Sequence, residues 1–407
     1  MNQNISPSPL RGSIPAIPSK SAAHRLLICA ALADSPTEVI CHGTSKDIEA
    51  TRACLAAMET GGILPCGESG STLRFLLPVA AALGLEAEFL MEGRLPQRPL
   101  APLDAQLTGH GARLSRPAPD RLRVSGRLTP GDYTLPGNVS SQYISGLLFA
   151  LPLLDAPSTL TVTGTVESAP YIAMTLDALG QFGVDVAVHN QVYAIPARGY
   201  RSPGKALVEG DWSNAAFWLC AGALAGPVTV TGLKPDSLQG DKAVLDILAQ
   251  FGAKTEQNGE HFTVFPGALQ ALDIDAAAIP DLVPVLSVVA AAAPGVTRIY
   301  NAGRLRLKES DRIRTVCAML QNLGADAEET ADGLLIRGGK PLTGGTVDSA
   351  NDHRIAMAAA VASVLCQGDV TVTGAEAVNK SYPGFWEDFE KLQKKGTDCY
   401  GPCRASQ

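Results

Sequence analysis

The sequence predicts an α/β protein with two compact lobes, in which helices pack under sheets. The chain has 407 residues. That is more than one hydrophobic core usually serves, so we expect two domains of roughly 200 residues each. Four similar segments join a Leu-rich helix, closed by glycine, to the start of a strand, and they read LDAQLTGHGARL, LDALGQFGVDV, LDILAQFGAKT and CAMLQNLGADAEE.

The glycines that close these helices recur at nearly constant spacing. They are Gly111, Gly183, Gly252 and Gly324, with steps of 72, 69 and 72 residues. A further 72 residues lead to Gly396, and a shortened copy ends at Gly61. The spacing predicts about six units, three in each lobe, with two helices each and short strands such as LRVSG, VYAIPA, FTVFPG and LLIRG. The alternative is chance recurrence of Leu-rich helices that end at glycine.

Composition excludes several classes of protein. With 46% hydrophobic residues the chain is neither disordered nor a disulfide scaffold. Nine cysteines without a CxxC pair predict neither disulfides nor a zinc site. The N-terminus lacks an apolar signal core, and the most apolar stretch, 282–294, is too short to span a bilayer. We expect a cytoplasmic protein with no metal and no membrane association.

The net charge of −7 argues against a nucleic-acid partner, because binding the phosphate backbone needs concentrated Lys and Arg. Single cations nevertheless recur inside Gly/Ser-rich segments. An acidic protein that gathers such cations in one place is typical of a small anionic ligand.

Two polar or Pro-containing segments are expected to connect the lobes. The prolines of IPAIPSK, at 14–20, favour extended backbone. In the segment 207–217 the chain passes from a strand to a helix that Asp211 or Ser213 can cap. The final residues, 396–407, are expected to form a frayed tail.

In the first half, polar residues precede apolar helices. PSKSAAHR places Lys20 and Ser21 at a helix N-terminus, where free N–H groups attract an anion, and Arg25 adds charge. The alternative is a plain N-cap with a solvated lysine. GESGSTLR repeats the design with Gly70 and Arg74, although its glycines fit a plain turn equally well.

Further polar groups follow in the same half. Arg94 and Arg98 flank prolines in a segment expected to be rigid and extended, suited to presenting guanidinium groups to a carboxylate. Two more helix starts carry hydrogen-bonding side chains, more than capping alone requires, and these are Ser140, Ser141, Gln142, Ser168 and Tyr171.

The second half adds carboxylates beside cations. Asp281 stands alone before a strongly apolar helix, where a raised pKa would make it a general base; an N-cap is the alternative. RLRLKESDRIR runs from strand to helix, with Lys308 and Arg312 predicted on one helical face. The alternative is that this cluster is a solvated, salt-bridged helix face without a functional role. Anion-binding cations also occur in NDHR, which includes Arg354, and at Lys380.

Six of these segments, in chain order, closely resemble a known enzyme family: PSKSAAHR, SGSTLR, QRP, SSQ, KESDR and NDHRIAM. The family is that of the 5-enolpyruvylshikimate-3-phosphate synthases (3-phosphoshikimate 1-carboxyvinyltransferases), and the resemblance runs from about residue 11 to about residue 390. It implies the two-domain enolpyruvyl transferase fold, with three βαβαββ repeats per domain in an inverse α/β-barrel-like arrangement. The implied domains are 20–209, with mainly shikimate 3-phosphate contacts, and 1–19 plus 210–407, with the acid/base and phosphoenolpyruvate contacts.

The resemblance implies transfer of the enolpyruvyl group of phosphoenolpyruvate to the 5-hydroxyl of shikimate 3-phosphate, with release of phosphate, in chorismate and aromatic amino-acid biosynthesis. It implies no cofactor, only small-molecule partners and a monomer. By resemblance the catalytic residues are Lys20, Asp281 and Glu309. Those that bind shikimate 3-phosphate are Lys20, Ser21, Arg25, Ser140, Ser141, Gln142, Ser168, Asp281 and Lys308. Those that bind phosphoenolpyruvate are Lys20, Gly70, Arg98, Gln142, Arg312, Arg354 and Lys380.

The sequence departs from the common family pattern at three places. Glu68 and Arg304 stand where many members have Asn, and AAHR replaces the frequent ISHR. The residue at 68 bears on the loop contact to phosphoenolpyruvate and to glyphosate, an inhibitor of the family.

Two other functions compete with this interpretation. UDP-N-acetylglucosamine enolpyruvyl transferase shares the fold and the donor but carries a reactive loop cysteine, and KESDR with SSQ favours the shikimate enzyme. A non-catalytic binding protein is the second alternative. Asp281, Glu309 and Lys20 argue against it, because a pure binder gains little from carboxylates that face anionic ligands.

Overall fold

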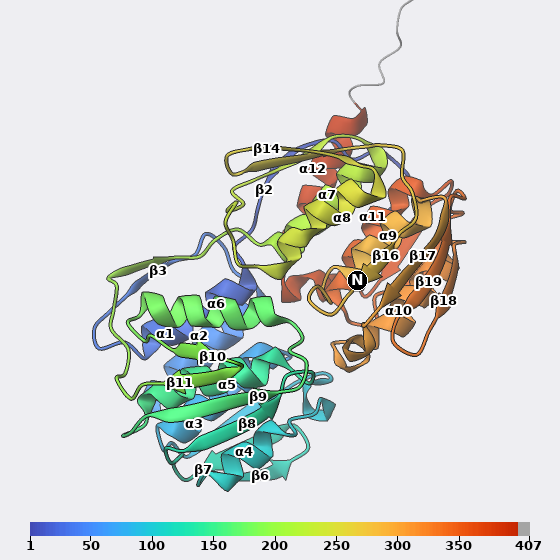
Figure 1. Ribbon diagram of the computed structural model, residues 1–407. Helices are drawn as coiled ribbons and strands as arrows, with labels where there is room; N and C mark the ends of the chain where they lie inside the picture. Colours follow the sequence, from blue (N-terminus) through green and yellow to red (C-terminus); the bar gives the residue numbers. More distant parts are fainter. Residues whose placement is uncertain (398–407) are drawn as a thin grey trace, which may run out of the picture. The chain divides into compact units, whose positions relative to one another are not determined.

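The structure, a computed structural model, describes residues 1–397 and consists of two compact units (Figure 1). Unit 1 comprises Met1–Ile17 and Glu209–Gln407, and unit 2 comprises Pro18–Val208. The division expected from the sequence differs from this one at residues 18, 19 and 209. Most of the predicted tail, 396–407, lies outside the described residues.

Unit 2 contains two four-stranded sheets and one strand pair. The first sheet has the order β4 (Ile63–Gly67), β5 (Ala87–Met91), β7 (Arg121–Ser125) and β6 (Arg113–Ala118). The second has the order β10 (Ala187–His189), β11 (Val192–Ile195), β9 (Ser158–Thr163) and β8 (Asp132–Pro136). The pair is β12 (Lys205–Leu207) with β3 (Glu38–Ile40).

The helices of unit 2 alternate with these strands along the chain. They are α1 (Lys20–Ala31), α2 (Lys46–Thr60), α3 (Gly70–Ala82), α4 (Leu103–Gly109), α5 (Ser141–Ala150) and α6 (Ala169–Gln181), with the 3-10 helices η1 (Leu95–Gln97) and η2 (Leu151–Leu153).

Unit 1 is built in the same way. One sheet has the order β14 (Lys254–Asn258), β15 (His261–Phe265), β13 (Val228–Thr231) and β2 (Gly12–Pro15). A second has the order β16 (Asp273–Asp275), β17 (Gly295–Tyr300), β19 (Leu334–Gly338) and β18 (Asp326–Glu329). The third has the order β1 (Asn2–Ile5), β21 (Val370–Thr373) and β20 (Gly345–Asp348).

The helices of unit 1 are α7 (Trp212–Ala225), α8 (Val244–Phe251), α9 (Val283–Ala292), α10 (Arg312–Asn322), α11 (His353–Ala362) and α12 (Phe385–Thr397). Its 3-10 helices are η3 (Gly240–Ala243), η4 (Gly303–Leu307), η5 (Ser363–Leu365) and η6 (Ala375–Lys380).

Every four-stranded sheet repeats one topology, which confirms the predicted α/β fold of βαβαββ units. Two parallel strands come first, and a helix then leads to an antiparallel hairpin. A helix joins the parallel strands in three of these sheets, whereas all of unit 2 and α7 lie between β2 and β13 in the fourth. The other two sheets combine segments distant in sequence, since β1 pairs with β21 and β12 pairs with β3. Among residues 1–397, each unit therefore contains three sheets, with the β12–β3 pair counted as one.

Local sequence explains the hairpins and the helix ends. Asn190 and Gln191, between β10 and β11, both have positive φ, as a two-residue type I′ turn requires. Gly111, Gly183, Gly252 and Gly324 all follow helices with positive φ, so the predicted helix-ending glycines are confirmed. Gly396 does not end a helix, because α12 continues to Thr397.

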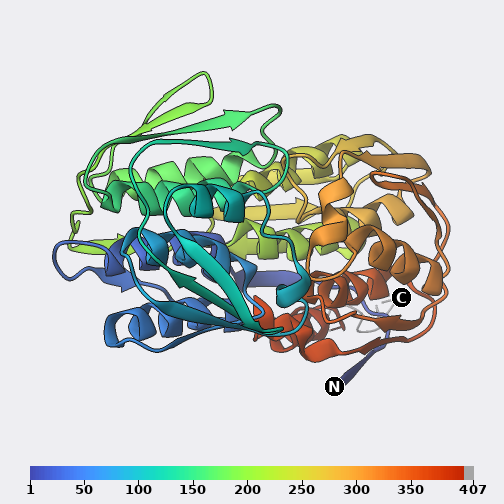
Figure 2. The ribbon, with the colours of Figure 1, turned by 90° about the horizontal axis from the view of Figure 1, so that it is seen from below.

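Each unit has its own hydrophobic core, in which apolar helices lie under the sheets. Helices α7, α9 and α11 are buried on nearly all sides and contact one another. In Figures 1 and 2 the sheet of β16–β19 lies outside α9 within unit 1. This arrangement leaves the helix N-termini as the places where polar side chains can gather.

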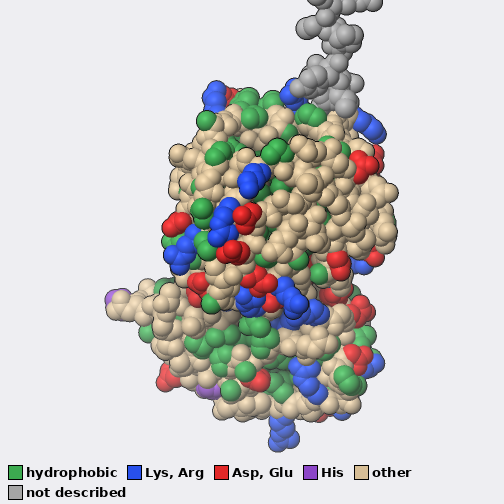
Figure 3. Space-filling model, turned by 90° about the vertical axis from the view of Figure 1, so that its right-hand side faces the viewer, with side chains coloured by type: hydrophobic (Ala, Val, Ile, Leu, Met, Phe, Trp, Pro, Cys, Tyr) green, Lys and Arg blue, Asp and Glu red, His purple; other side chains and the backbone are tan. Residues whose placement is uncertain are grey.

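The surface is mixed in charge, and no helix among residues 1–397 is both long and apolar enough to cross a bilayer. On the face shown in Figure 3, Lys and Arg side chains stand among Asp and Glu side chains.

The end of α4 offers a matched test of the glycine repeat. A Cβ at Gly111, where φ is +102°, would lie 2.5 Å from the Arg127 carbonyl oxygen, whereas a Cβ at Gly109 would meet nothing within 4 Å. We expect Gly111→Ala to lower the free energy of unfolding by about 2 kcal/mol, and Gly109→Ala to leave it unchanged or raise it slightly. Urea unfolding followed by circular dichroism measures both, and equal effects would contradict this account of the repeat.

Candidate active site

In unit 2, the first predicted motif lies at the start of α1. Ser19 caps the helix by accepting a hydrogen bond from the Ala22 N–H (3.3 Å), and Lys20 and Ser21 occupy the first turn, as predicted. The Lys20 ammonium pairs with Asp47 in the first turn of α2, at 2.9 Å. Sequence reasoning missed this carboxylate, since nothing near Asp47 in the chain indicates its partner.

Arg25, one turn further along α1, is buried and hydrogen-bonded to the protein. Its Nε donates to Thr175 Oγ1 (2.9 Å), and its two Nη atoms donate to the Ser21 and Tyr171 carbonyl oxygens (2.6 and 2.8 Å). Burial lowers the pKa of Arg25 to about 10, so the side chain is still a cation at neutral pH. Arg25 therefore joins α1 to α6 while keeping its charge beside Ser21.

The predicted polar cluster before α5 connects that helix to α3. Ser140 caps α5, and Ser141 is its first residue. Gln142 accepts a hydrogen bond from Arg74 (2.9 Å) and donates one to Ser71 (2.9 Å). Ser140 therefore caps a helix, whereas Gln142 joins α5 to Ser71 and Arg74 of the segment GESGSTLR.

Two guanidinium groups converge on Gly70, the first residue of α3. A Cβ at Gly70 would lie 2.6 Å from Arg74 Nη1 and 2.7 Å from Arg98 Nη1, so the site requires glycine. Two cations beside free helical N–H groups favour a bound anion. The structure therefore brings Gly70 and Arg98 together, as predicted. The prediction of an extended segment between Arg94 and Arg98 is wrong, because Leu95–Gln97 forms a 3-10 helix.

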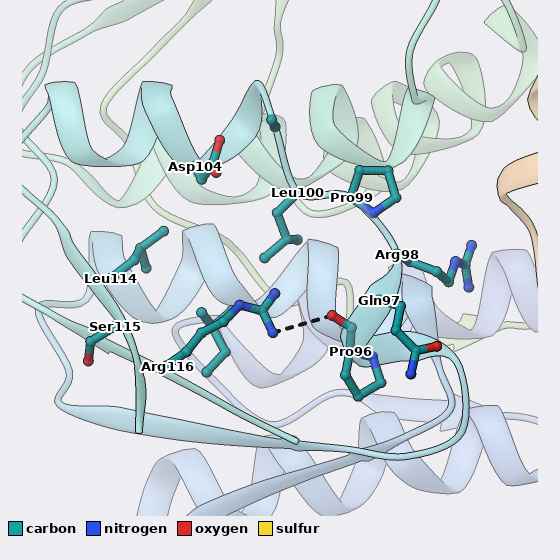
Figure 4. Close-up of a pocket in the computed structure, with 11 residues that line it drawn as sticks. Pro96, Gln97, Arg98, Pro99, Leu100, Asp104, Leu114, Ser115 and Arg116 are labelled. Atoms are coloured by element: carbon teal, nitrogen blue, oxygen red, sulfur yellow. Dashed lines mark hydrogen bonds between the residues drawn. The ribbon is translucent and has the colours of Figure 1, made fainter. Parts of the chain in front are cut away.

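A surface pocket of about 610 Å³ lies beside this cluster and is lined by residues around Pro96–Ala101 and Leu114–Arg116. In Figure 4, Arg116 reaches the Pro96 carbonyl oxygen, and Arg98 lies on the far side of Pro96 from Arg116. Because the Arg98 guanidinium approaches Gly70, its charge belongs with the α3 N-terminus rather than with this pocket.

Two more residues of unit 2 were singled out from the sequence. Ser168, just before α6, is buried and has φ of +54° and ψ of +37°, a left-handed conformation that is unusual for serine. Glu68 lies against Gly93, where a Cβ would come 2.6 Å from the Glu68 carboxyl carbon. Glu68 lies in the short connection between β4 and α3, directly before the helix that Gly70 begins.

In unit 1, Arg312 is the centre of a buried ionic cluster. It is only 1% exposed, and its three nitrogens contact three carboxylates: Nη1 with Asp281 (2.6 Å), Nη2 with Glu309 (2.8 Å) and Nε with Asp352 (2.8 Å). Burial opposes its charge, but the carboxylates of Asp352, Glu309 and Asp281 raise the pKa of Arg312 above its ordinary value. The predicted acid and base therefore share one cation.

Asp281 is also bound by Arg354. The Arg354 Nη2 atom lies 3.2 Å from Asp281 Oδ2, and Nη1 donates to the Asp281 carbonyl oxygen at 3.1 Å. Asp281 is not an N-cap, since α9 begins after Leu282. The prediction of a raised pKa is wrong: burial alone would raise it, but Arg354, Lys308 and Arg312 together hold the pKa of Asp281 well below its usual range.

Lys308 lies before α10 and not on it, so the predicted helical face shared with Arg312 is wrong. Asp311 caps that helix, and Arg312 is its first residue. The Lys308 ammonium lies 3.9 Å from Asp281 Oδ1. Burial lowers the pKa of Lys308 to about 8, against the opposing effect of Asp281, so the group can gain or lose a proton near neutral pH.

Lys380, at the end of η6, reaches the start of α11. Its Nζ donates to the Asn351 carbonyl oxygen at 2.6 Å. Ala350 and Asn351 have φ of +51° and +55°, and this strained turn aims the carbonyl at the ammonium group. Arg304 donates to the Ala277 carbonyl oxygen at 2.7 Å, and its charge is one of the effects that lower the pKa of Lys308.

The arrangement suits proton transfer beside anions. In unit 2, cations and hydroxyls gather at helix N-termini, and in unit 1 the carboxylates of Asp281 and Glu309 are held by Arg312 beside Lys308 and Arg354. Among residues 1–397 there is no group of three or more His, Cys, Asp or Glu side chains that could hold a metal ion.

We expect Arg312→Gln to lower the free energy of unfolding by about 3–5 kcal/mol at neutral pH, because it leaves buried carboxylates without their cation. Arg312 holds the pKa of Asp281 and Asp352 low, so these groups stabilise the fold above about pH 4 and lose that contribution as the pH falls. In the variant their pKa values rise, so the difference between the two proteins should shrink toward acid pH.

Arg314→Gln is the matched control for this experiment, because Arg314 lies on the same helix but is exposed. Chemical unfolding at several pH values measures all three proteins. A penalty for Arg312→Gln no larger than for Arg314→Gln would contradict the role of the buried cluster.

The chain is similar to known proteins over nearly its whole length. Residues 5–389 match the family model described as EPSP synthase (3-phosphoshikimate 1-carboxyvinyltransferase). The chain is 40% identical over 420 residues to the 3-phosphoshikimate 1-carboxyvinyltransferase of Clostridium acetobutylicum, covering 95% of this chain and 96% of that protein. It is 41% identical over 413 residues to the enzyme of that name from Clostridium kluyveri, covering 96% of each.

Solved structures show the same fold at lower identity. EPSP synthase from Acinetobacter baumannii superposes with a TM-score of 0.79 at 24% identity, covering 96% of this chain and 98% of that one. The enolpyruvyl transferase NikO from Streptomyces tendae gives a TM-score of 0.75 at 18% identity, covering 96% of each chain. By its sequence matches over nearly its whole length, the chain belongs to the EPSP synthase (3-phosphoshikimate 1-carboxyvinyltransferase) family.

Proposed function

We propose that this protein transfers the enolpyruvyl group of phosphoenolpyruvate to the 5-hydroxyl of shikimate 3-phosphate, giving 5-enolpyruvylshikimate 3-phosphate and phosphate. The observation that carries the proposal is the buried Arg312, which holds Asp281 and Glu309 together beside Lys308 and Arg354. The names of the relatives describe the same reaction, which serves chorismate and aromatic amino-acid biosynthesis.

The proposed contacts follow the chemistry of each cluster. Shikimate 3-phosphate is assigned to the hydroxyls and cations of unit 2, with two residues of unit 1: Lys20, Ser21, Arg25, Ser140, Ser141, Gln142, Ser168, Asp281 and Lys308. Phosphoenolpyruvate is assigned to Lys20, Gly70, Arg98, Gln142, Arg312, Arg354 and Lys380. The convergence of Arg74 and Arg98 on Gly70 supports the second assignment, because two guanidinium groups and helical N–H groups match a doubly anionic ligand.

The reaction has an addition step and an elimination step, and each step needs two proton transfers. Glu309 donates a proton to the methylene carbon of phosphoenolpyruvate while Asp281 accepts the proton of the attacking 5-hydroxyl, which forms a tetrahedral intermediate. Both transfers then reverse: Glu309 removes a proton from the new methyl group, and the proton on Asp281 goes to the departing phosphate. Lys20 and the arginines stabilise the leaving anion.

The low pKa of Asp281 bears on this mechanism. An ionised carboxylate is ready to accept a proton at neutral pH, but a strongly stabilised one is a weak base. Lys308, with its pKa near 8 and its ammonium group beside Asp281, provides a second proton carrier at the same place.

We also propose a cytoplasmic location and a monomeric state. The described cysteines are Cys29, Cys41, Cys54, Cys66, Cys220, Cys317 and Cys366, all free thiols, which supports a reducing compartment. The monomer rests on the family resemblance.

The first test follows inorganic phosphate release from phosphoenolpyruvate and shikimate 3-phosphate. We expect release that requires both substrates, and a loss of at least about 100-fold in kcat for Asp281→Asn and for Glu309→Gln, because each removes one proton transfer. Glu260→Gln and Asp273→Asn change exposed carboxylates of the same unit and should leave kcat unchanged.

Other outcomes discriminate the rival functions. Release with UDP-N-acetylglucosamine in place of shikimate 3-phosphate would assign the protein to the nucleotide-sugar reaction. Binding of shikimate 3-phosphate without phosphate release would show a binding protein instead of an enzyme.

A further inference from the structure

A buried chain of four polar side chains connects three helices of unit 2. It begins at His24 on α1, passes through Thr51 on α2, and ends at Thr72 and Ser69 at the start of α3. None of the four is more than 1% exposed. Helix α1 contacts α2, and α2 contacts α3, so the chain follows the packing of the helices. None of these side chains was predicted to contact a substrate.

The hydrogen bonds of this chain run in one direction. Thr72 Oγ1 donates to Ser69 Oγ at 2.7 Å, and Ser69 Oγ also accepts from the Thr72 N–H at 3.3 Å. Because a hydroxyl has one proton, Thr72 Oγ1 must accept from Thr51 Oγ1, which lies 2.7 Å away. Thr51 in turn must accept from His24 Nδ1 at 2.6 Å. The hydrogen bonds therefore place the ring proton of His24 on Nδ1.

The other ring nitrogen indicates that the imidazole is neutral. His24 Nε2 is buried and has no hydrogen-bond partner among residues 1–397. A proton there would give a buried N–H group without an acceptor, near the positive charges of Lys20 and Arg25. Burial and these two charges hold the pKa of His24 well below its ordinary value. His24 is thus an uncharged donor at neutral pH.

The chain ends at the turn that begins α3. Ser69 caps this helix, and the next residue, Gly70, lies against the guanidinium groups of Arg74 and Arg98. The first N–H groups of a helix have no partner within the helix, and the cap residue sets where they point. A displaced cap would therefore move the N–H groups that are proposed to face phosphoenolpyruvate.

Capping alone does not require this chain. Ser45 and Ser140 cap α2 and α5 by accepting from one backbone N–H each, at 3.4 and 3.3 Å. Ser69 accepts such a bond and also a second one from the Thr72 hydroxyl, which is itself held from α2. Burying further polar groups costs free energy even when they are paired, so their placement calls for another role.

We propose that His24 is a positioning residue for the phosphoenolpyruvate site. As a donor from Nδ1 it orients the hydroxyls of Thr51 and Thr72, and through them it fixes Ser69 and the first turn of α3. The chain also ties α1, whose start is assigned to shikimate 3-phosphate, to the helix start assigned to phosphoenolpyruvate. The inference rests on the proposed function for the identity of these ligands. His24 acts through the hydroxyls and not on a reacting atom.

Two substitutions of Thr51 separate positioning from packing. Thr51→Val keeps the volume and removes the hydroxyl, whereas Thr51→Ser keeps the hydroxyl and removes a methyl group. We expect Thr51→Val to raise KM for phosphoenolpyruvate by about 10-fold, as the loss of one hydrogen bond can do, with a change in kcat of less than about threefold. Thr51→Ser should stay within about twofold of the wild type in both. A larger rise in KM for Thr51→Ser than for Thr51→Val would overturn the proposal.

A double-mutant cycle tests the donor itself. His24→Leu should raise KM for phosphoenolpyruvate by about 10-fold, and the double variant with Thr51→Val also by about 10-fold rather than about 100-fold, because both changes break one chain. His24→Asn keeps an amide N–H close to the position of Nδ1 and should restore KM to within about threefold of the wild type. Additive losses, or the same KM for His24→Leu and His24→Asn, would contradict a role as donor.

Two controls address folding. Thr60→Val makes the same change at an exposed position of α2 and should leave KM and kcat unchanged. All variants are assayed well below their unfolding temperatures, which are measured separately. If KM rises in proportion to the loss of stability across the variants of Thr51 and His24, the chain has a structural role only and the proposal fails.

A measurement without turnover keeps this inference distinct from the proposed function. In protein with 15N-labelled histidine and no substrate, the ring whose signals are absent from His24→Asn should carry its proton on Nδ1 and should not titrate between about pH 6 and pH 8. Thr51→Val should shift the Nδ1 resonance, because this N–H loses its acceptor. A proton on Nε2 would overturn the inference even if the enzyme is active, whereas failure of phosphate release alone would contradict only the proposed function.

Discussion

The ionic cluster around Arg312 is the constraint on which the rest of unit 1 depends. A guanidinium group that is 1% exposed must be paired, and its three carboxylates come from segments far apart in the chain: before α9, before α10 and at the N-cap of α11. Removing any of these segments from its place would leave buried charge uncompensated. The interaction that assembles the candidate acid and base therefore also joins the starts of α9, α10 and α11, so stability and chemistry share one set of contacts.

In unit 2, neutral side chains connect the helices. His24 on α1, Thr51 on α2, and Thr72 and Ser69 at the start of α3 form a buried chain of hydrogen bonds with steps of 2.6, 2.7 and 2.7 Å. Burial, with the nearby charges of Lys20 and Arg25, holds the pKa of His24 well below its ordinary value, so this chain carries no charge at neutral pH. Helix starts joined by hydroxyls leave the cations of unit 2 facing fewer carboxylates than those of unit 1, which suits binding an anion more than moving a proton.

The sequence predicted the architecture and the helix starts well, because both depend on local signals. Glycine closes each repeated helix by adopting positive φ, and Ser19, Ser140 and Asp352 begin theirs by accepting backbone hydrogen bonds. The electrostatics of the site depend on partners distant in the chain. Asp281 looked like a carboxylate in an apolar setting, yet Arg354, 73 residues away, lies against it. Asp47 went unrecognised for the same reason, since no neighbouring residue reveals its contact with Lys20.

These distant partners also decide how strong a base Asp281 can be. Arg354, Lys308 and Arg312 hold its pKa low, and in the proposed reaction Arg354 and Arg312 are also the cations that face the anionic donor. A phosphate or carboxylate that draws positive charge toward itself weakens the stabilisation of the ionised Asp281. Its pKa then rises, since the charges that lowered it are shared with the ligand. Binding of the donor would thus prepare the base for the hydroxyl proton, and a carboxylate that is weakly basic in the empty protein is compatible with general base catalysis once the substrates are bound.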